Sequence, residues 1–178
     1  MKKVNYIEFW KKNLFYFLCA FFIGISFILK GNVLDHPLID NLGSSNFVSY
    51  GPNVIFILLI ATFIHNNVHI SNFLIVRSKI KKFLYFQYSS TFLMLFIYTF
   101  SQYLLAFVLA TISGFNISKI DIVFIITNTI SLAIIVLILN LMNYGVNRLL
   151  LIILSIGISL MYHYAFLMSF LNELYTQY

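Results

Sequence analysis

The chain has 178 residues, of which 61% are hydrophobic and only 9% are charged, and its formal net charge is +6. Soluble domains carry about 25% charged residues, so this composition excludes an ordinary soluble domain and indicates a membrane protein. A span of the ~30 Å hydrocarbon core needs about 20 apolar residues, which leaves room for five or six spans and for no separate catalytic domain. The basic charge does not imply a nucleic-acid partner, because membrane proteins gather Lys and Arg in their cytoplasmic loops.

The N-terminal segment combines basic residues with Tyr6 and Trp10, two residue types that favour the membrane–water interface. Wound as a helix, it has its apolar and aromatic side chains on one stripe, so we expect an interfacial helix over 1–12 along the inner leaflet. A plain aromatic and basic anchor before the first span is the alternative. The apolar run that follows has no small-x-small cleavage site, which predicts a retained span. Cys19, the single cysteine, excludes an internal disulfide.

Apolar runs further along the chain predict the remaining helices. Together they give spans near 13–30, 47–65, 84–112, 120–143 and 148–171. The first two spans are joined by a long segment rich in Gly, Pro, Asp and Asn, which is typical of a loop, and the other connections are short. We therefore predict one all-α transmembrane domain over 1–178, a polytopic helix bundle of five to six spans.

The distribution of Lys and Arg predicts how the bundle is oriented, because positive charge is retained in the cytoplasm. With the N-terminus inside, Lys30 and Lys119 lie outside and the other nine of the eleven basic residues lie in the cytoplasm. These nine are Lys2, Lys3, Lys11, Lys12, Arg77, Lys79, Lys81, Lys82 and Arg148. We expect a multi-pass protein of the plasma membrane with a cytoplasmic N-terminus.

The segment between the second and third predicted spans carries a polar stretch, HNNVH, and then a basic cluster, RSKIKK. At 100° per residue its apolar side chains share one face, which predicts a cytoplasmic amphipathic helix over 66–82. The residues of that face are Phe73, Val76, Ile80, Phe83 and Leu84. Two interpretations remain open: a collar that attracts anionic headgroups, at ~1 kcal/mol per basic residue, or a docking element for a soluble partner.

In this order of features, residues 3–112 resemble the membrane subunits of type-2 ATP-binding-cassette exporters, especially small bacterial permeases of peptide and bacteriocin systems. In that family a short basic helix after the second span couples the membrane domain to a separate ATPase subunit. The matching positions here are Arg77, Ser78, Lys79, Lys82 and Phe83. Two departures stand out: the family's acidic residue before this helix is absent, and its usual six spans are hard to fit.

The resemblance implies a permease subunit of an ATP-driven exporter, which is not itself an enzyme and holds no cofactor. ATP and Mg²⁺ would bind a partner ATP-binding-cassette ATPase, and a second permease copy or a paralogue would complete the membrane domain in the lipid bilayer. The scarcity of charge inside the spans favours a hydrophobic or amphipathic peptide or a lipid-like substrate. The expected ATPase-coupling residues are Asn66, Asn67, His69, Phe73, Val76, Arg77, Ser78, Lys79, Lys82 and Phe83.

Other polar residues suggest weaker candidates for a site. Several lie inside predicted spans, where such groups usually form hydrogen bonds between helices: Ser89, Ser90, Thr91, Gln102, Tyr103, Asn128, Asn140 and His163. His65 and His69 are spaced as a ligand pair on one helical face, but no third ligand is near, so no metal site is predicted.

The chain contains none of the nucleotide-binding or hydrolase motifs that would indicate catalysis. A second class of function therefore stays open beside the exporter. It is a small multi-pass accessory or immunity protein, which binds a partner or a toxic peptide in the membrane and transports nothing.

Overall fold

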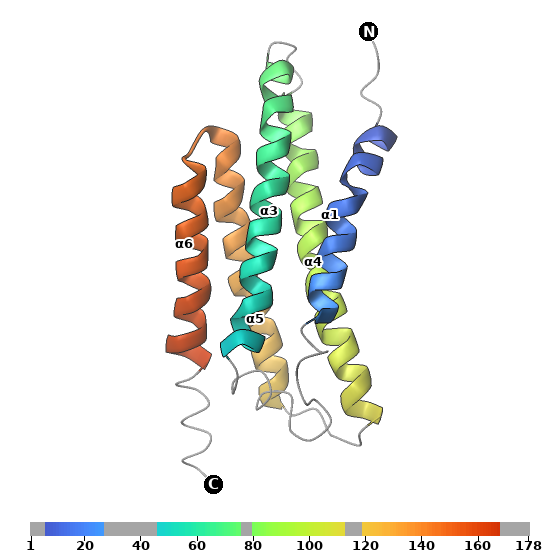
Figure 1. Ribbon diagram of the computed structural model, residues 1–178, viewed down its shortest axis with the longest axis vertical. Helices are drawn as coiled ribbons and strands as arrows, with labels where there is room; N and C mark the ends of the chain where they lie inside the picture. Colours follow the sequence, from blue (N-terminus) through green and yellow to red (C-terminus); the bar gives the residue numbers. More distant parts are fainter. Residues whose placement is uncertain (1–5, 27–45, 76–79, 113–118, 168–178) are drawn as a thin grey trace.

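The computed structural model describes residues 6–26, 46–75, 80–112 and 119–167, and within these ranges every regular element is a helix. Five α-helices run along a bundle in alternating directions (Figure 1). They are α1 (Tyr6–Ser26), α3 (Asn46–Ile75), α4 (Ile80–Ile112), α5 (Lys119–Asn140) and α6 (Arg148–Met161). A 3₁₀ helix, η1 (Leu141–Tyr144), extends α5, and a π-helix, η2 (Tyr162–Leu167), extends α6. The predicted all-α helix bundle is therefore confirmed.

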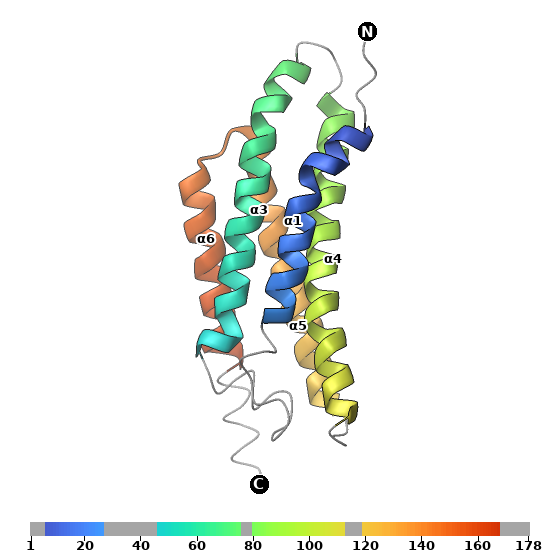
Figure 2. The same cartoon turned by 45° about the vertical axis from the view of Figure 1, so that its right-hand side comes forward.

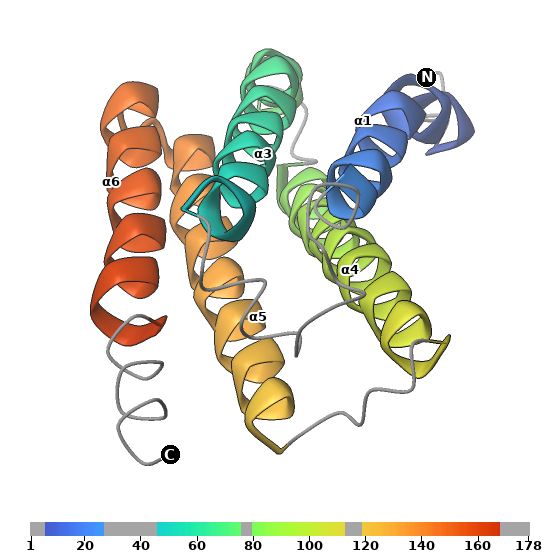
Figure 3. The same ribbon diagram turned by 60° about the horizontal axis from the view of Figure 1, so that its bottom comes forward.

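Helix α3 lies at the centre of the bundle, because it packs against each of the other four helices. Helix α1 packs mainly on α4, and α6 packs on α5 and α3. Viewed from one end, α1 and α6 consequently lie on opposite sides of α3 (Figure 3), and the second side view shows the same separation (Figure 2). A displacement of α3 would reach every other helix directly.

Three of these helices are long and apolar enough to cross a membrane. Their apolar parts are Gly51–Val68, Ile122–Tyr144 and Arg148–Ala165. Helix α1 offers a shorter apolar stretch, Asn13–Ser26, and α4 is the longest helix, with 33 residues. The structure thus supports a membrane protein with three candidate spans, while the predicted total of five to six stays a prediction.

In the part of the chain that the structure describes, the segments expected to form short interfacial and coupling helices belong to longer helices. Helix α1 begins at Tyr6 and continues through Lys12 to Ser26, so the described part of 1–12 belongs to the first long helix. Helix α3 continues to Ile75, so residues 66–75 extend it, and residues 80–82 open α4. Neither stretch contains a glycine or proline at the expected boundary, so nothing in the sequence interrupts the backbone hydrogen bonds there. Residues 1–5 and 76–79 lie outside the described ranges.

The contact between α1 and α4 depends on small side chains. The inward face of α1 consists of Asn13, Phe17, Ala20 and Gly24, all of them buried. The Ala-x-x-x-Gly spacing lets two helix backbones approach closely, as small residues do in membrane proteins. A Cβ atom on Gly24 would lie 2.0 Å from the Ser101 hydroxyl oxygen and 2.7 Å from the Tyr98 carbonyl oxygen. Only glycine fits between the two helices at this point.

The turn between η1 and α6 follows the usual chemistry of helix ends. Gly145 has a φ of +84° and its N–H donates to the Met142 carbonyl at 3.1 Å, which closes η1. Glycine adopts this left-handed conformation without the strain that a Cβ atom would add. Two residues later the Asn147 side chain accepts a hydrogen bond from the Leu149 N–H at 2.9 Å and caps α6. The short loop predicted between these helices is therefore a tight hairpin.

Candidate functional site

One end of the bundle gathers most of the basic residues that the structure describes, and we call it the basic end. Helices α1, α4 and α6 begin there and α3 ends there (Figure 1). The side chains of Lys11, Lys81, Lys82 and Arg148 lie in or near the first turns of these helices, and all four are exposed. Lys119 opens α5 at the opposite end. Cations from three distant parts of the sequence thus share one end of the molecule.

Helix α3 carries a cluster of polar residues near its end at the basic end. His65, Asn66 and Asn67 stand eight to ten residues before the end of the helix at Ile75. At 1.5 Å per residue that is about 12–15 Å of helix. In Figure 1 this end of α3 extends past the first turns of α4 and α6.

The ten expected ATPase-coupling residues differ in what the structure says of them. Asn66 and Lys82 are exposed, whereas Asn67 and Phe83 are buried in the bundle. The Asn67 amide donates to the Phe63 carbonyl of its own helix at 3.0 Å. Asn67 and Phe83 therefore hold the helix ends in place and do not face a soluble partner.

The remaining expected residues cannot be assigned a surface. His69 and Phe73 belong to α3, and only their backbone is described, while Val76, Arg77, Ser78 and Lys79 lie outside the described residues. Lys81 was not among the expected contacts, yet it is exposed beside Lys82. Its position directly beside Lys82 in the basic cluster was the sequence signal that could have identified it as a contact.

Interhelical hydrogen bonds of the side chains join the helices in pairs, and three of them have the same chemistry, a tyrosine hydroxyl with an asparagine amide. Tyr98 of α4 donates to Asn53 of α3 at 2.7 Å, and the Tyr98 ring stacks on Phe56 with ring centres 4.3 Å apart. Asn128 of α5 donates to Tyr103 of α4. The third pair joins α1 to α3, where Asn66 donates to the Tyr16 hydroxyl at 2.6 Å. Sequence reasoning singled out Tyr103 and Asn128 but missed Tyr98 and Asn53.

Two further side-chain hydrogen bonds also join helices of the bundle. Asn140 of α5 donates to the Thr91 hydroxyl of α4 at 3.0 Å, and also to the Val136 carbonyl at 2.8 Å. The hydroxyls of Thr127 and Tyr162 lie 2.9 Å apart and join α5 to the start of η2. Polar groups inside a membrane bundle gain stability from such partners, and these residues therefore act as links between helices.

Two buried glutamines of α4 are exceptions to this pairing. Gln87 is fully buried, and neither its amide oxygen nor its amide nitrogen has a hydrogen-bond partner among the described residues. The amide oxygen of Gln102 is also unpaired within that part of the chain. An unpaired amide in a buried site costs stability. These two glutamines of α4 therefore destabilise the bundle relative to apolar residues of similar size.

Histidine, cysteine and carboxylate side chains do not gather into a metal site in the ranges that the structure describes. His65 is partly buried on α3, and the side chain of His69 is not described. His163 is buried at the start of η2. The described geometry gives no ligand set beyond the His65–His69 spacing already seen in the sequence.

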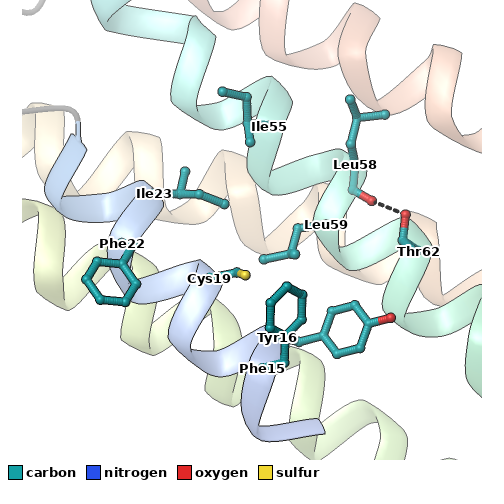
Figure 4. Close-up of a pocket in the computed structure, with 9 residues that line it drawn as sticks. All are labelled: Phe15, Tyr16, Cys19, Phe22, Ile23, Ile55, Leu58, Leu59 and Thr62. Atoms are coloured by element: carbon teal, nitrogen blue, oxygen red, sulfur yellow. Dashed lines mark hydrogen bonds between the residues drawn. The ribbon is translucent and has the colours of Figure 1, made fainter.

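An apolar groove lies between α1 and α3 on the outside of the bundle, with a volume of about 540 Å³ (Figure 4). We call it the α1–α3 groove. Because the two helices are antiparallel, Ile23 lies near Ile55, and Tyr16 lies near Thr62. The lining residues are Phe15, Tyr16, Cys19, Phe22 and Ile23 of α1 and Ile55, Leu58, Leu59 and Thr62 of α3. The Thr62 hydroxyl donates to the Leu58 carbonyl at 2.8 Å, so even this polar lining residue is internally satisfied.

The site features of this protein are thus an exposed basic end, a set of interhelical hydrogen bonds and an apolar lateral groove. Comparison of the chain with protein-family models, with curated proteins and with solved structures gives no match in any of the three.

Proposed function

We propose that this chain is the membrane permease subunit of an ATP-driven exporter, a multi-pass protein with a cytoplasmic N-terminus and a separate ATPase subunit. The observation that carries the proposal is the basic end, because the exposed Lys11, Lys81, Lys82 and Arg148 all belong to that end of the bundle. Basic residues are retained in the cytoplasm, where an ATPase subunit would be found. An apolar helix bundle without a nucleotide-binding motif needs such a partner to use ATP.

The proposed contact with the ATPase is the α3–α4 end, not a separate coupling helix. The last turns of α3 extend past the first turn of α4 at this end of the bundle (Figure 1). Lys81 and Lys82 in the first turn of α4 would meet the partner, because both are exposed. Asn67 and Phe83 are buried and would transmit the displacement into the bundle.

The central place of α3 suggests how ATP hydrolysis would act on the membrane domain. Closure of two ATPase subunits would push on the end of α3, which packs on α1, α4, α5 and α6. A second permease copy or a paralogue would face this one across the transport path. A hydrophobic or amphipathic peptide or a lipid-like molecule is the proposed substrate, in line with the scarcity of charge inside the spans.

The test is copurification and coupling with an ATPase. The tagged chain, extracted from its native membrane, should bring down a subunit with a P-loop, and ATP hydrolysis by the complex should depend on the permease. Reversing both charges with Lys81→Glu and Lys82→Glu should lower recovery of that subunit about tenfold, since exposed ion pairs contribute up to ~1 kcal/mol each. Lys119→Glu, at the opposite end, is the matched control and should leave recovery unchanged.

The second class of function makes the opposite prediction. An accessory or immunity protein would retain its protective activity in the Lys81→Glu and Lys82→Glu variant, and no P-loop subunit would copurify with it. That pair of results would contradict the exporter proposal.

A further inference from the structure

The α1–α3 groove has an apolar lining and lies on the outside of the bundle. Along α1 its lining extends from Phe15 to Ile23, which is about 12 Å of helix. Its volume of about 540 Å³ is within the range of about 300–1,000 Å³ usual for ligand sites. Nearby side chains of α1 that do not line the groove, such as Leu14 and Leu18, are exposed as lipid-facing residues are. The groove thus lies beside side chains that are placed to contact lipid.

The end of this groove nearest the basic end is polar and positively charged. On α1, Lys11 and Lys12 stand one helical turn before the lining residues Phe15 and Tyr16, and the Lys11 side chain is exposed. On α3, Asn66 stands one turn after Thr62 and donates to the Tyr16 hydroxyl. That bond uses the oxygen of Tyr16, so the hydroxyl proton can be donated to a ligand.

Two other occupants fit the groove poorly. An extended peptide would bring N–H and C=O groups into a lining whose Thr62 hydroxyl is already bonded to Leu58, and unsatisfied backbone groups are costly in hydrocarbon. A transmembrane helix is predominantly apolar and would leave the exposed Lys11 at the end of the groove without an anionic partner. A single flexible acyl chain that carries an anionic headgroup has neither problem.

We propose that the α1–α3 groove holds one acyl chain of an anionic phospholipid, whose phosphate lies beside Lys11 at the basic end. Positive charge above an apolar slot matches the two parts of such a lipid, and the Tyr16 hydroxyl is placed to donate to its ester or phosphate oxygens. Occupancy of the groove requires no ATPase and no transport, so the proposed lipid site stands apart from the proposed function.

The probe is phosphatidylglycerol, compared with phosphatidylcholine of the same acyl chains, titrated into the purified full chain in detergent and read by native mass spectrometry. The wild-type protein should retain one phosphatidylglycerol in preference to phosphatidylcholine. Lys11→Ala should lower that preference about fivefold, the value of one basic residue near an anionic headgroup. Arg148→Ala removes the same charge from α6, on the other side of the bundle, and should change little.

The apolar half of the site needs its own variants. Cys19→Trp fills the groove from α1 and Thr62→Phe fills it from α3, and each should abolish retention of both lipids. Leu14→Trp places the same tryptophan at an exposed position of α1 that does not line the groove, and it should retain lipid normally. Circular dichroism confirms that each variant is still helical. Loss in both filled variants but not in Leu14→Trp cannot be ascribed to misfolding of one helix.

Several outcomes would overturn the proposal. Equal retention of the two lipids by the wild-type protein would show that the headgroup makes no specific contact. An equal loss of phosphatidylglycerol preference in Lys11→Ala and Arg148→Ala would mean that the basic residues attract anionic lipid in general. Lipid retention that survives both groove-filling variants would place the lipid elsewhere. A second copy of the chain or a peptide, retained in place of lipid and lost on filling the groove, would assign the groove to that occupant.

Discussion

The close contact of α1 with α4 predicts that Gly24→Ala destabilises the bundle. A carbon and an oxygen atom come no closer than about 3.3 Å without strain. The added Cβ would fall short of that distance by about 1.3 Å at Ser101 (3.3 − 2.0) and by about 0.6 Å at the Tyr98 carbonyl (3.3 − 2.7). The Ser101 hydroxyl can rotate away only by losing its 2.9 Å bond to the Tyr98 carbonyl. That carbonyl belongs to the helix backbone and cannot move alone, so the helices must separate.

Overpacking of this kind costs about 1–3 kcal/mol, and we expect Gly24→Ala to lie in that range. The assay is reversible unfolding of the purified chain in mixed micelles with increasing sodium dodecyl sulfate, followed by circular dichroism. Adding Ser101→Gly to Gly24→Ala removes the shorter contact but keeps the carbonyl contact, so it should restore only part of the loss.

The matched control is Gly157→Ala on α6, where a Cβ atom would meet nothing within 4 Å. It should be neutral or should stabilise the helix by about 0.5–1 kcal/mol, because alanine replaces a glycine inside a helix. Equal effects of Gly24→Ala and Gly157→Ala would refute the reasoning, since they would show that α1 and α4 do not touch at Gly24.

Three more predictions use the same unfolding assay. Tyr98→Phe keeps the ring but removes the hydroxyl that donates to the buried Asn53 amide oxygen, so it should lower the free energy of unfolding by about 1–2 kcal/mol. Adding Asn53→Leu should recover most of this loss, and no recovery would contradict the pairing. Gln87→Met should raise stability by about 1 kcal/mol because the amide that it removes is buried and has no partner among the described residues. A lower stability would show that the amide is hydrogen-bonded in the micelle. Gly145→Ala should cost about 1 kcal/mol at a φ of +84°, and an unchanged midpoint would contradict the left-handed turn.

The five helices are predictable from the sequence because a long apolar run bounded by polar residues has few alternatives to a helix in a membrane protein. Their outer ends are less predictable. The changes from polar to apolar residues after Lys12 and from apolar to polar residues near Asn66 suggested that separate helices begin or end there. The helical backbone instead continues through both positions. Polarity marks where a helix meets the membrane surface, whereas only the backbone hydrogen bonds decide where it ends.

The pairing between helices is the part that the sequence alone does not predict. Asn128 and Tyr103 are noticeable as polar residues in apolar runs, but their partnership depends on the rotation and the vertical offset of α4 and α5. The groove has the same origin, because Cys19 lines it only where α1 and α3 diverge. Chain-distant contacts of this kind follow from packing in three dimensions. The periodicity of one helix says which face is apolar and not which helix will cover it.

The two attachments of α1 differ in a way that matters for movement. Near its end, at Gly24, the helix is pressed against the backbone of α4, in a buried contact with no room to slide. Toward the basic end, the hydrogen bond between Asn66 and Tyr16 and the edge-to-face contact of Tyr16 with Phe63 join it to α3. The hydrogen bond is exposed and therefore open to competition from water or a headgroup. A ligand that replaces this bond would loosen α1 from α3 at the basic end without disturbing the contact of α1 with α4 at Gly24.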